Sequence, residues 1–137
     1  MFLFCGLGNP GDKYKNTRHN LGFKLANKLI NHYEFDEVKI DKSKELYSGK
    51  IKNFKILILK PLTYMNLSGG VISETLNFYK IKLENLYVIH DDLDLQLAKV
   101  KIKKGGGNGG HNGLESIDQY LTKEYNRIRI GIDHPGE

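Results

Sequence analysis

The spacing of hydrophobic residues changes several times along this chain, and each change predicts a new element. Short apolar or alternating runs predict strands, which we expect at 2–7, 46–51, 54–60, 86–90, 97–103 and 127–132. Longer segments with an apolar residue every three or four positions predict helices near 20–33, 68–79 and 114–121. Because helices alternate with strands, we predict the α/β class: a single domain with a twisted β-sheet flanked by helices.

One pair of strands differs from the others in its connection. The strands at 46–51 and 54–60 are joined only by a tight turn at Lys52-Asn53, and Pro61 ends the second of them. Two strands connected so closely pair with each other in an antiparallel way. We therefore predict a mixed sheet rather than a purely parallel one.

Composition narrows the choice of partner and compartment. The chain has 137 residues, a net charge of +5 and a pI of about 9.2, which favours anionic partners such as nucleic acid. Its one cysteine, Cys5, cannot form an intramolecular disulfide, and its apolar surroundings predict a buried core residue. The N-terminus lacks the charged flank of a signal peptide, and apolar runs such as 56–59 are too short to cross a membrane. We expect a cytoplasmic protein with no membrane partner.

A glycine motif follows the first predicted strand. Gly6-x-Gly8-x-x-Gly11 matches the dinucleotide-binding fingerprint, which requires a helix that opens at the glycines. Here the helix is delayed until about residue 20, and Pro10 lacks the backbone N–H that a phosphate cradle would use. We therefore interpret the motif as a tight turn that presents Asn9 at the carboxyl end of the strand, where α/β sheets place their sites.

A histidine and a carboxylate stand at two element boundaries. His19 precedes the first helix, and Asp91 directly follows the apolar strand 86–90. A carboxylate at that point can accept the imidazole N–H of His19, fix its tautomer and raise its basicity. Such a pair without a nucleophilic Ser or Cys indicates water as the nucleophile. Two alternatives stay open for the acidic run: an ordinary turn, or a magnesium site for phosphoryl transfer built from Asp91, Asp92 and Asp94.

Three asparagines lie in loop or glycine-bounded settings. Asn9 follows the first strand, Asn66 lies between a strand and a helix, and Asn112 lies in a glycine-rich run. An amide both donates and accepts hydrogen bonds, which suits recognition of an ester or amide carbonyl. Ser68 is a candidate N-cap for the second helix. The three amides together favour a polar pocket, although each one alone is also compatible with a turn.

Basic residues recur on one face of the last two predicted strands. Lys101 and Lys103 share a face of one strand, and Arg127 and Arg129 share a face of the next. They form either a solvated edge that discourages aggregation or a row of contacts to nucleic-acid phosphates. Three rings are candidates for stacking on a terminal base: Tyr14, Tyr64 and His111.

Five motifs stand in a fixed order over residues 6–136. They are Gly6-Leu7-Gly8-Asn9-Pro10-Gly11 with Tyr14 and Thr17-Arg18-His19-Asn20; Lys60-Pro61 through Tyr64-Met65-Asn66-Leu67-Ser68-Gly69; His90-Asp91-Asp92-Leu93-Asp94; Gly109-Gly110-His111-Asn112-Gly113-Leu114; and Arg129-Ile130-Gly131-Ile132 with His134-Pro135-Gly136. None is specific alone. Together they resemble the signatures of bacterial peptidyl-tRNA hydrolase along nearly the whole chain.

The resemblance implies hydrolysis of the ester bond in peptidyl-tRNA, with His19 as the general base that activates water and Asp91 as its orienting partner. It implies that the following residues contact the substrate: Asn9, Tyr14, Tyr64, Met65, Asn66, His111 and Asn112. It implies contacts to tRNA phosphates from three basic residues: Lys101, Lys103 and Arg129. It also implies a monomer that takes tRNA as its partner and uses no metal and no organic cofactor.

The same resemblance sets expectations about extent and alternatives. We expect residues 1–137 to form one peptidyl-tRNA hydrolase-like domain that lacks the C-terminal helical segment of the family. Two rival classes stay open beside it. One is a metal-dependent phosphoryl-transfer enzyme that uses the acidic run 91–94, and the other is a non-catalytic RNA-binding module.

Overall fold

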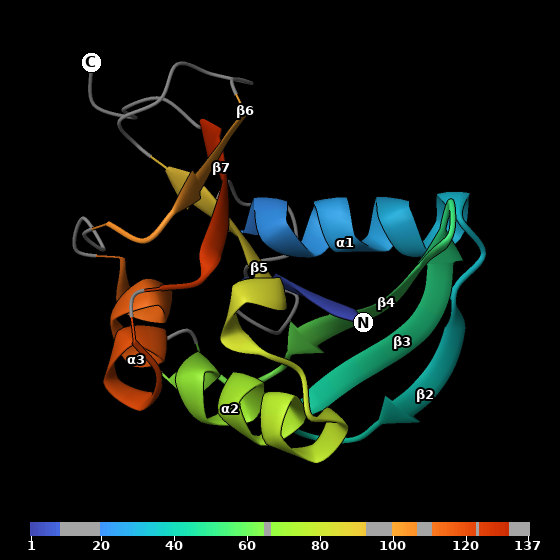
Figure 1. The fold of residues 1–137 in the computed structure, drawn as a ribbon, viewed down its shortest axis with the longest axis horizontal. Helices are drawn as coiled ribbons and strands as arrows, with labels where there is room; N and C mark the ends of the chain where they lie inside the picture. Colours follow the sequence, from blue (N-terminus) through green and yellow to red (C-terminus); the bar gives the residue numbers. More distant parts are fainter. Residues whose placement is uncertain (9–19, 65–66, 93–99, 107–110, 123, 132–137) are drawn as a thin grey trace.

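The computed structural model describes residues 1–8, 20–64, 67–92, 100–106, 111–122 and 124–131, which form a twisted sheet with helices on both faces (Figure 1). The strands are β1 (Phe2–Gly6), β2 (Asp36–Ile40), β3 (Lys44–Ile51), β4 (Phe54–Pro61), β5 (Leu86–Asp92), β6 (Val100–Lys104) and β7 (Asn126–Gly131). The helices are α1 (Leu21–His32), α2 (Ser68–Tyr79), the single 3-10 turn η4 (Leu83–Asn85) and α3 (Asn112–Tyr120). The predicted α/β class is confirmed.

The sheet is mixed, as the sequence predicts. Its strand order is β2-β3-β4-β1-β5-β7-β6. The four central strands β4, β1, β5 and β7 are parallel to one another. The outer strands are antiparallel to their neighbours, with β2 and β3 on one side and β6 on the other. The predicted turn between β3 and β4 is present, and Lys52 adopts the left-handed conformation there, with φ 56°.

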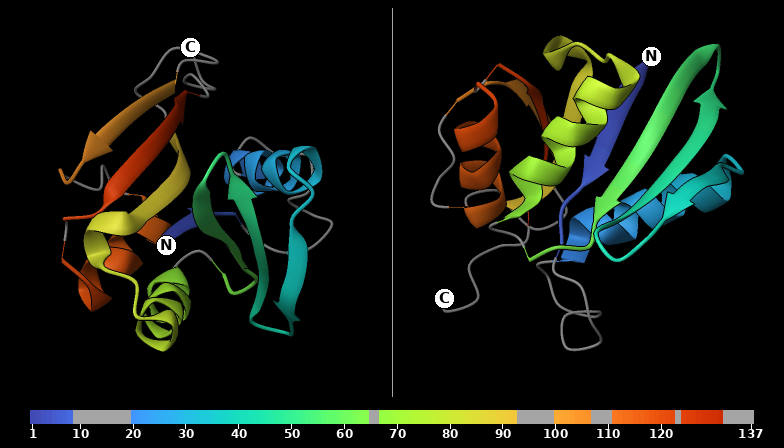
Figure 2. Two further views of the ribbon diagram at one scale, coloured as in Figure 1. Left: turned by 45° about the vertical axis from the view of Figure 1, so that its right-hand side comes forward. Right: turned by 90° about the horizontal axis from the view of Figure 1, so that it is seen from below.

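Helices cover both faces of the sheet: α1 lies on one face, and α2 and α3 lie on the other (Figures 1 and 2). The larger core lies beneath α2 and α3, and its buried members include Leu3, Cys5, Leu59, Ile72, Val88, Leu114 and Ile117. The smaller core lies beneath α1 and includes Ala26, Ile30, Phe35, Ile56 and Ile58. Each fully buried aliphatic side chain contributes about 1.5–3 kcal/mol, so these two cores dominate the stability of the layered fold. Burial also raises the pKa of the Cys5 thiol far above its usual range, as expected for a core cysteine.

The N-terminus of α2 is capped from outside the helix. Ser68 was the candidate N-cap, and this prediction is wrong: Leu67 occupies the cap position without a side-chain bond, and Ser68 is the first helical residue. Instead, the Ser116 hydroxyl of α3 accepts a hydrogen bond from the Gly69 N–H at 2.9 Å. One of the terminal donors of α2 is therefore satisfied by α3, which joins the two helices at close range.

Two differences from the prediction concern strands β2 and β5. Strand β2 was not predicted, because all five of its residues are exposed and only Val38 and Ile40 alternate with polar residues. Strand β5 continues beyond His90 through Asp91 and Asp92, which pair with Ile130 and Gly131 of β7. The run that suggested a turn thus begins inside the sheet, and Asp91 is held by a strand rather than by a loop.

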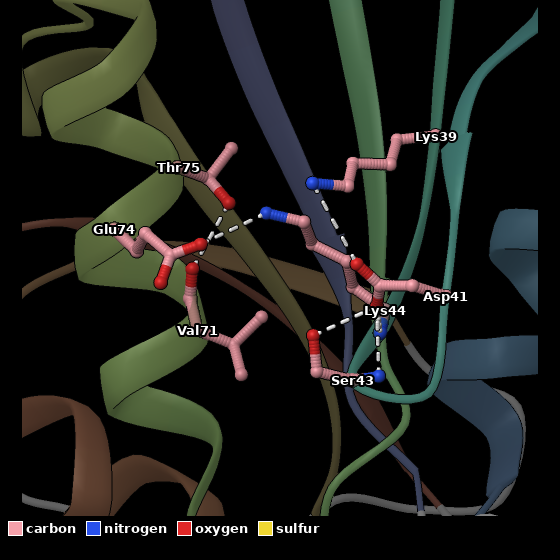
Figure 3. Close-up of polar contacts among 7 residues, drawn as sticks. All are labelled: Lys39, Asp41, Ser43, Lys44, Val71, Glu74 and Thr75. Atoms are coloured by element: carbon pink, nitrogen blue, oxygen red, sulfur yellow. Dashed lines mark hydrogen bonds and ion pairs between the residues drawn. The ribbon is translucent and has the colours of Figure 1, made fainter.

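A buried lysine ties the antiparallel part of the sheet to α2 (Figure 3). The Lys44 ammonium lies 3.2 Å from the Glu74 carboxylate, and the lysine side chain is only 9% exposed. The turn before Lys44 is organised by Asp41, whose carboxylate accepts hydrogen bonds from the backbone and hydroxyl of Ser43. These bonds hold the pKa of Asp41 below its usual value. The cluster lies where β3 begins beside the end of β4, since Lys44 is opposite Pro61, and it ties this end of the sheet to α2.

Candidate active site

The carboxyl ends of four parallel strands lie along one edge of the sheet. The chain leaves this edge after Gly6 of β1, Pro61 of β4, Asp92 of β5 and Gly131 of β7. Four of the five sequence motifs include one of these strand ends. Because α/β sheets bind their ligands at the carboxyl ends of strands, this edge is the candidate active site.

Glycines at this edge admit the start of helix α1. A Cβ at Gly6 would lie 2.4 Å from the carbonyl oxygen of Gly22, and a Cβ at Gly8 would lie 2.7 Å from the ring of Phe23. A Cβ at Gly22 would lie 2.7 Å from the carbonyl oxygen of Ile89 in β5. No side chain fits at these three positions without a shift of the backbone or ring. The glycines of the first motif therefore allow close contact between a helix and two strand ends.

This packing gives the first motif a purpose other than phosphate binding. Helix α1 begins at Leu21, so it does not open at the glycines as the dinucleotide fingerprint requires. Its cap residue, Asn20, is buried and follows His19 directly in the chain. Because Gly22 lies against Ile89, the beginning of α1 meets β5 two residues before Asp91. The structure thus brings the described end of the His19 motif to the strand that carries Asp91.

Asp91 is bonded to a histidine that lies twenty residues further along the chain. The Nε2 atom of His111 lies 2.8 Å from Asp91 Oδ1, and the two side chains are 14% and 7% exposed. The other ring nitrogen, Nδ1, accepts hydrogen bonds from the backbone N–H groups of Gly113 at 3.1 Å and Leu114 at 3.3 Å. His111 is therefore the N-cap of α3 and at the same time a partner of Asp91.

A second histidine, His90, belongs to the same cluster and was not among the predicted site residues. It is buried, and its Nδ1–H donates a hydrogen bond to the Asp91 carbonyl oxygen at 2.7 Å. Its ring meets the His111 ring edge-on, with centroids 5.3 Å apart. The sequence signal for His90 was its position directly before Asp91 at a strand end. The end of β5 is thus a compact polar cluster of two imidazoles and one carboxylate.

The remaining predicted substrate residues fall into two groups. Tyr64 lies just after β4 and is 63% exposed. Asn112 is the exposed first residue of α3, next to His111. Five predicted residues lie outside the described part of the chain: Asn9, Tyr14, His19, Met65 and Asn66. Among the described residues, the structure therefore brings Asp91, His111 and Asn112 together at the carboxyl edge.

The predicted phosphate contacts lie on the outer strands. Lys101 of β6 is opposite Arg129 of β7, and Lys103 is opposite Arg127. Directly opposite residues in an antiparallel pair share a face, so all four basic residues project to the same side of the sheet. Lys101 and Lys103 are exposed, and Arg129 is partly buried.

Arg127 shares a strand face with Arg129, which suggested that both contact phosphates, but Arg127 is buried. It is 3% exposed, and its guanidinium donates to the Gly106 carbonyl oxygen at 3.0 Å and lies 3.7 Å from the Asp118 carboxylate of α3. Asp118 also accepts a hydrogen bond from the Tyr125 hydroxyl at 3.0 Å, and burial raises the pKa of that phenol. Arg127 is thus neutralised inside the fold, where it anchors α3 to the sheet and is out of reach of a nucleic-acid backbone.

The described part of the chain lacks two features that would indicate other kinds of site. Within it, no group of three His, Cys, Asp or Glu side chains is arranged to hold a metal ion. Within the same residues, no helix is both long enough and apolar enough to span a membrane.

Comparisons with known proteins point to one family. Residues 3–137 match the family model described as peptidyl-tRNA hydrolase. The peptidyl-tRNA hydrolase of Ehrlichia ruminantium (strain Gardel) is 47% identical over 135 residues, covering 98% of this chain and 70% of that protein. The peptidyl-tRNA hydrolase of Neorickettsia sennetsu is 50% identical over 131 residues, covering 96% of this chain and 68% of that protein.

A solved structure is similar along the whole chain. The crystal structure of peptidyl-tRNA hydrolase from Acinetobacter baumannii superposes with a TM-score of 0.93 at 40% sequence identity. The match covers 100% of this chain and 70% of that one. The fold described above is therefore the fold of that structure over the shared part.

Proposed function

The chain belongs to the peptidyl-tRNA hydrolase family, and from this membership we propose how its carboxyl-edge site performs the reaction. The reaction is hydrolysis of the ester bond between the peptide and the tRNA in peptidyl-tRNA, which releases the tRNA. The observation that carries this function is the family match over residues 3–137. We assign the whole of 1–137 to one catalytic domain that acts as a monomer.

In this proposal His19 is the general base and Asp91 is its partner. Ester hydrolysis at neutral pH needs a water molecule that loses a proton as it attacks, and an imidazole is the side chain suited to accept that proton. A nearby carboxylate fixes the imidazole tautomer and stabilises the imidazolium that forms. Two features support Asp91 in this role: it is buried at the end of a central strand, and α1, which follows His19, begins beside that strand.

The substrate groups are assigned by their chemistry. Asn66 and Asn112 donate amide N–H groups to the scissile ester and its developing oxyanion, and Asn9 contacts the peptide side of the bond. The position of Asn112 supports this assignment, since it is exposed at the start of α3 beside the residue that is bonded to Asp91. The mechanism uses no metal and no organic cofactor. Three further side chains line the pocket around the amides: Tyr14, Tyr64 and Met65.

A cleavage assay with a chelator tests the proposed reaction. We expect the protein to release N-acetylated amino acid from an N-blocked, charged elongator tRNA at the same rate with and without EDTA, because water is activated by an imidazole. The released product is quantified from acid-soluble radioactivity. Loss of cleavage in EDTA, restored by magnesium, would favour a metal-dependent enzyme, and salt-dependent tRNA binding without cleavage would favour an RNA-binding module.

Lys101, Lys103 and Arg129 are proposed to contact tRNA phosphates. Lys101→Ala should weaken tRNA binding and reduce the slope of log K against log salt by about 1, since one phosphate contact is lost. Filter binding at several salt concentrations measures both quantities. Lys55→Ala is the matched control, because Lys55 is also exposed but lies at the amino end of β4, away from the carboxyl edge. An equal change in both variants would mean that only the overall charge matters.

A further inference from the structure

We propose that His111 is a positioning residue that sets the orientation of the Asp91 carboxylate, rather than a group that binds substrate. The inference rests on the proposed function, in which Asp91 orients the general base. The inference goes beyond the proposed function because it assigns to His111 a role that the sequence motif does not indicate. The reasons lie in the two nitrogens of the His111 ring.

The start of α3 determines which nitrogen of His111 carries the hydrogen. Nδ1 receives two backbone N–H groups, from Gly113 and Leu114, so it must be the unprotonated acceptor. In the neutral ring the single hydrogen is therefore on Nε2, 2.8 Å from Asp91 Oδ1. The helix N-terminus thus selects the tautomer that donates to the carboxylate. The contact is nearly excluded from solvent, where a hydrogen bond to an ionised acceptor is at its strongest.

The ring is mounted on a helix that cannot easily move. Leu114 and Ile117 of α3 are buried in the larger core, and Ser116 is bonded to Gly69 of α2. A donor fixed in this way restricts rotation of the Asp91 carboxylate about its last torsion angle. Because Asp91 itself is fixed in a central strand, both oxygens of the carboxylate then have defined directions.

A substrate-binding role makes a different demand on the ring. Both nitrogens of His111 already have partners in the fold, and the side chain is 14% exposed. To bind substrate through a ring nitrogen, His111 would have to give up either the helix cap or Asp91. A positioning role therefore predicts an effect on kcat, whereas a substrate contact predicts an effect on KM.

Two substitutions separate the contacts of the ring. His111→Asn places an amide oxygen near the position of Nδ1, so it retains the helix cap but cannot reach Asp91. His111→Gln places an amide N–H near the position of Nε2, so it retains a donor to Asp91 but loses the cap. We expect His111→Asn to keep the wild-type Tm and KM while kcat falls by about ten- to a hundredfold, the loss of one hydrogen bond to a charged group. We expect His111→Gln to lower Tm while kcat stays within about threefold.

The outcomes are measured as kcat, KM and Tm at a temperature where both variants are folded. A wild-type kcat for folded His111→Asn overturns the inference, as does a raised KM with unchanged kcat. Equal losses of kcat in the Asn and Gln variants also overturn it. Asp91→Asn distinguishes failure of this inference about His111 from failure of the proposed role of Asp91. If that change lowers kcat and His111→Asn does not, only the inference fails; if Asp91→Asn leaves kcat unchanged, the role of Asp91 in the proposed function fails as well.

A measurement without substrate tests the tautomer directly. Long-range proton–nitrogen correlation spectra of the ¹⁵N-histidine-labelled protein should show His111 protonated at Nε2, with His111→Gln identifying the signal. A ring protonated at Nδ1 alone would contradict the assignment, because that tautomer can neither cap α3 nor donate to Asp91.

Discussion

His19→Ala should lower kcat for cleavage of peptidyl-tRNA by about 10²–10⁴-fold, the range that general base catalysis contributes. Without the imidazole, the attacking water must lose its proton to solvent, and Asp91 has no base to orient. Affinity for tRNA should stay nearly unchanged, since the proposed phosphate contacts lie on β6 and β7. Single-turnover cleavage and filter binding, measured on the same preparation, separate the two effects.

The control for this change is a histidine at the other end of the helix that follows His19. His32 is exposed in the last turn of α1, so His32→Ala removes the same side chain far from the carboxyl edge and should leave kcat unchanged. Weakened tRNA binding by His19→Ala at normal kcat would assign His19 to substrate recognition and remove it from the chemistry.

The helices show how much of the fold the sequence predicts. α1 and α2 have apolar residues at regular helical spacing and were predicted to within one or two residues of their bounds. β2 was missed because its exposed residues form a strand only through pairing with β3. The end of β5 was placed too early because Asp91 and Asp92 are polar, and hydrophobicity cannot indicate a strand that is extended by pairing with β7.

The candidate site likewise has features that the sequence predicts and features that only the fold shows. Asp91 could be predicted because an acidic run at the end of an apolar strand is visible in one sequence segment. Its bond to His111 could not, because a contact across twenty residues depends on where α3 begins relative to β5. Arg127 was misjudged for the same reason: alternation gives the face of a strand, but only packing brings the Asp118 carboxylate of α3 over that face.

We therefore expect the position of α3 to affect both stability and activity. The helix has His111 as its N-cap, which contacts Asp91 at the candidate site, and carries Asp118 further along, which contacts Arg127 near the amino end of β7. The helix approaches α2 closely where Gly69 of α2 meets the backbone of Ser116. A substitution at Gly69 should therefore alter the position of the Asp91 carboxylate, although it changes no residue of the site.

Gly69→Ala is expected to destabilise the protein by about 1–3 kcal/mol, the usual range for overpacking. The added Cβ would lie 2.2 Å from the carbonyl oxygen of Ser116, and backbone cannot rotate away as a side chain can. Gly70→Ala is the matched control, since its Cβ would lie 3.5 Å from the Tyr120 ring, an ordinary contact. That variant should gain up to about 1 kcal/mol, because alanine favours a helix more than glycine does. Urea unfolding measures both changes.

The same pair of variants tests the link to the site. If α3 retreats from α2 to admit the methyl group that Gly69→Ala adds, His111 moves with it, and displacements of about 1 Å can lower turnover by as much as 10²-fold. Folded Gly69→Ala should then show reduced kcat at a temperature well below its Tm, while Gly70→Ala keeps the wild-type value. Equal stabilities in the two variants would mean that the helices separate without strain. A destabilised Gly69→Ala with normal kcat would instead mean that α3 holds Asp91 less tightly than its contact through His111 indicates.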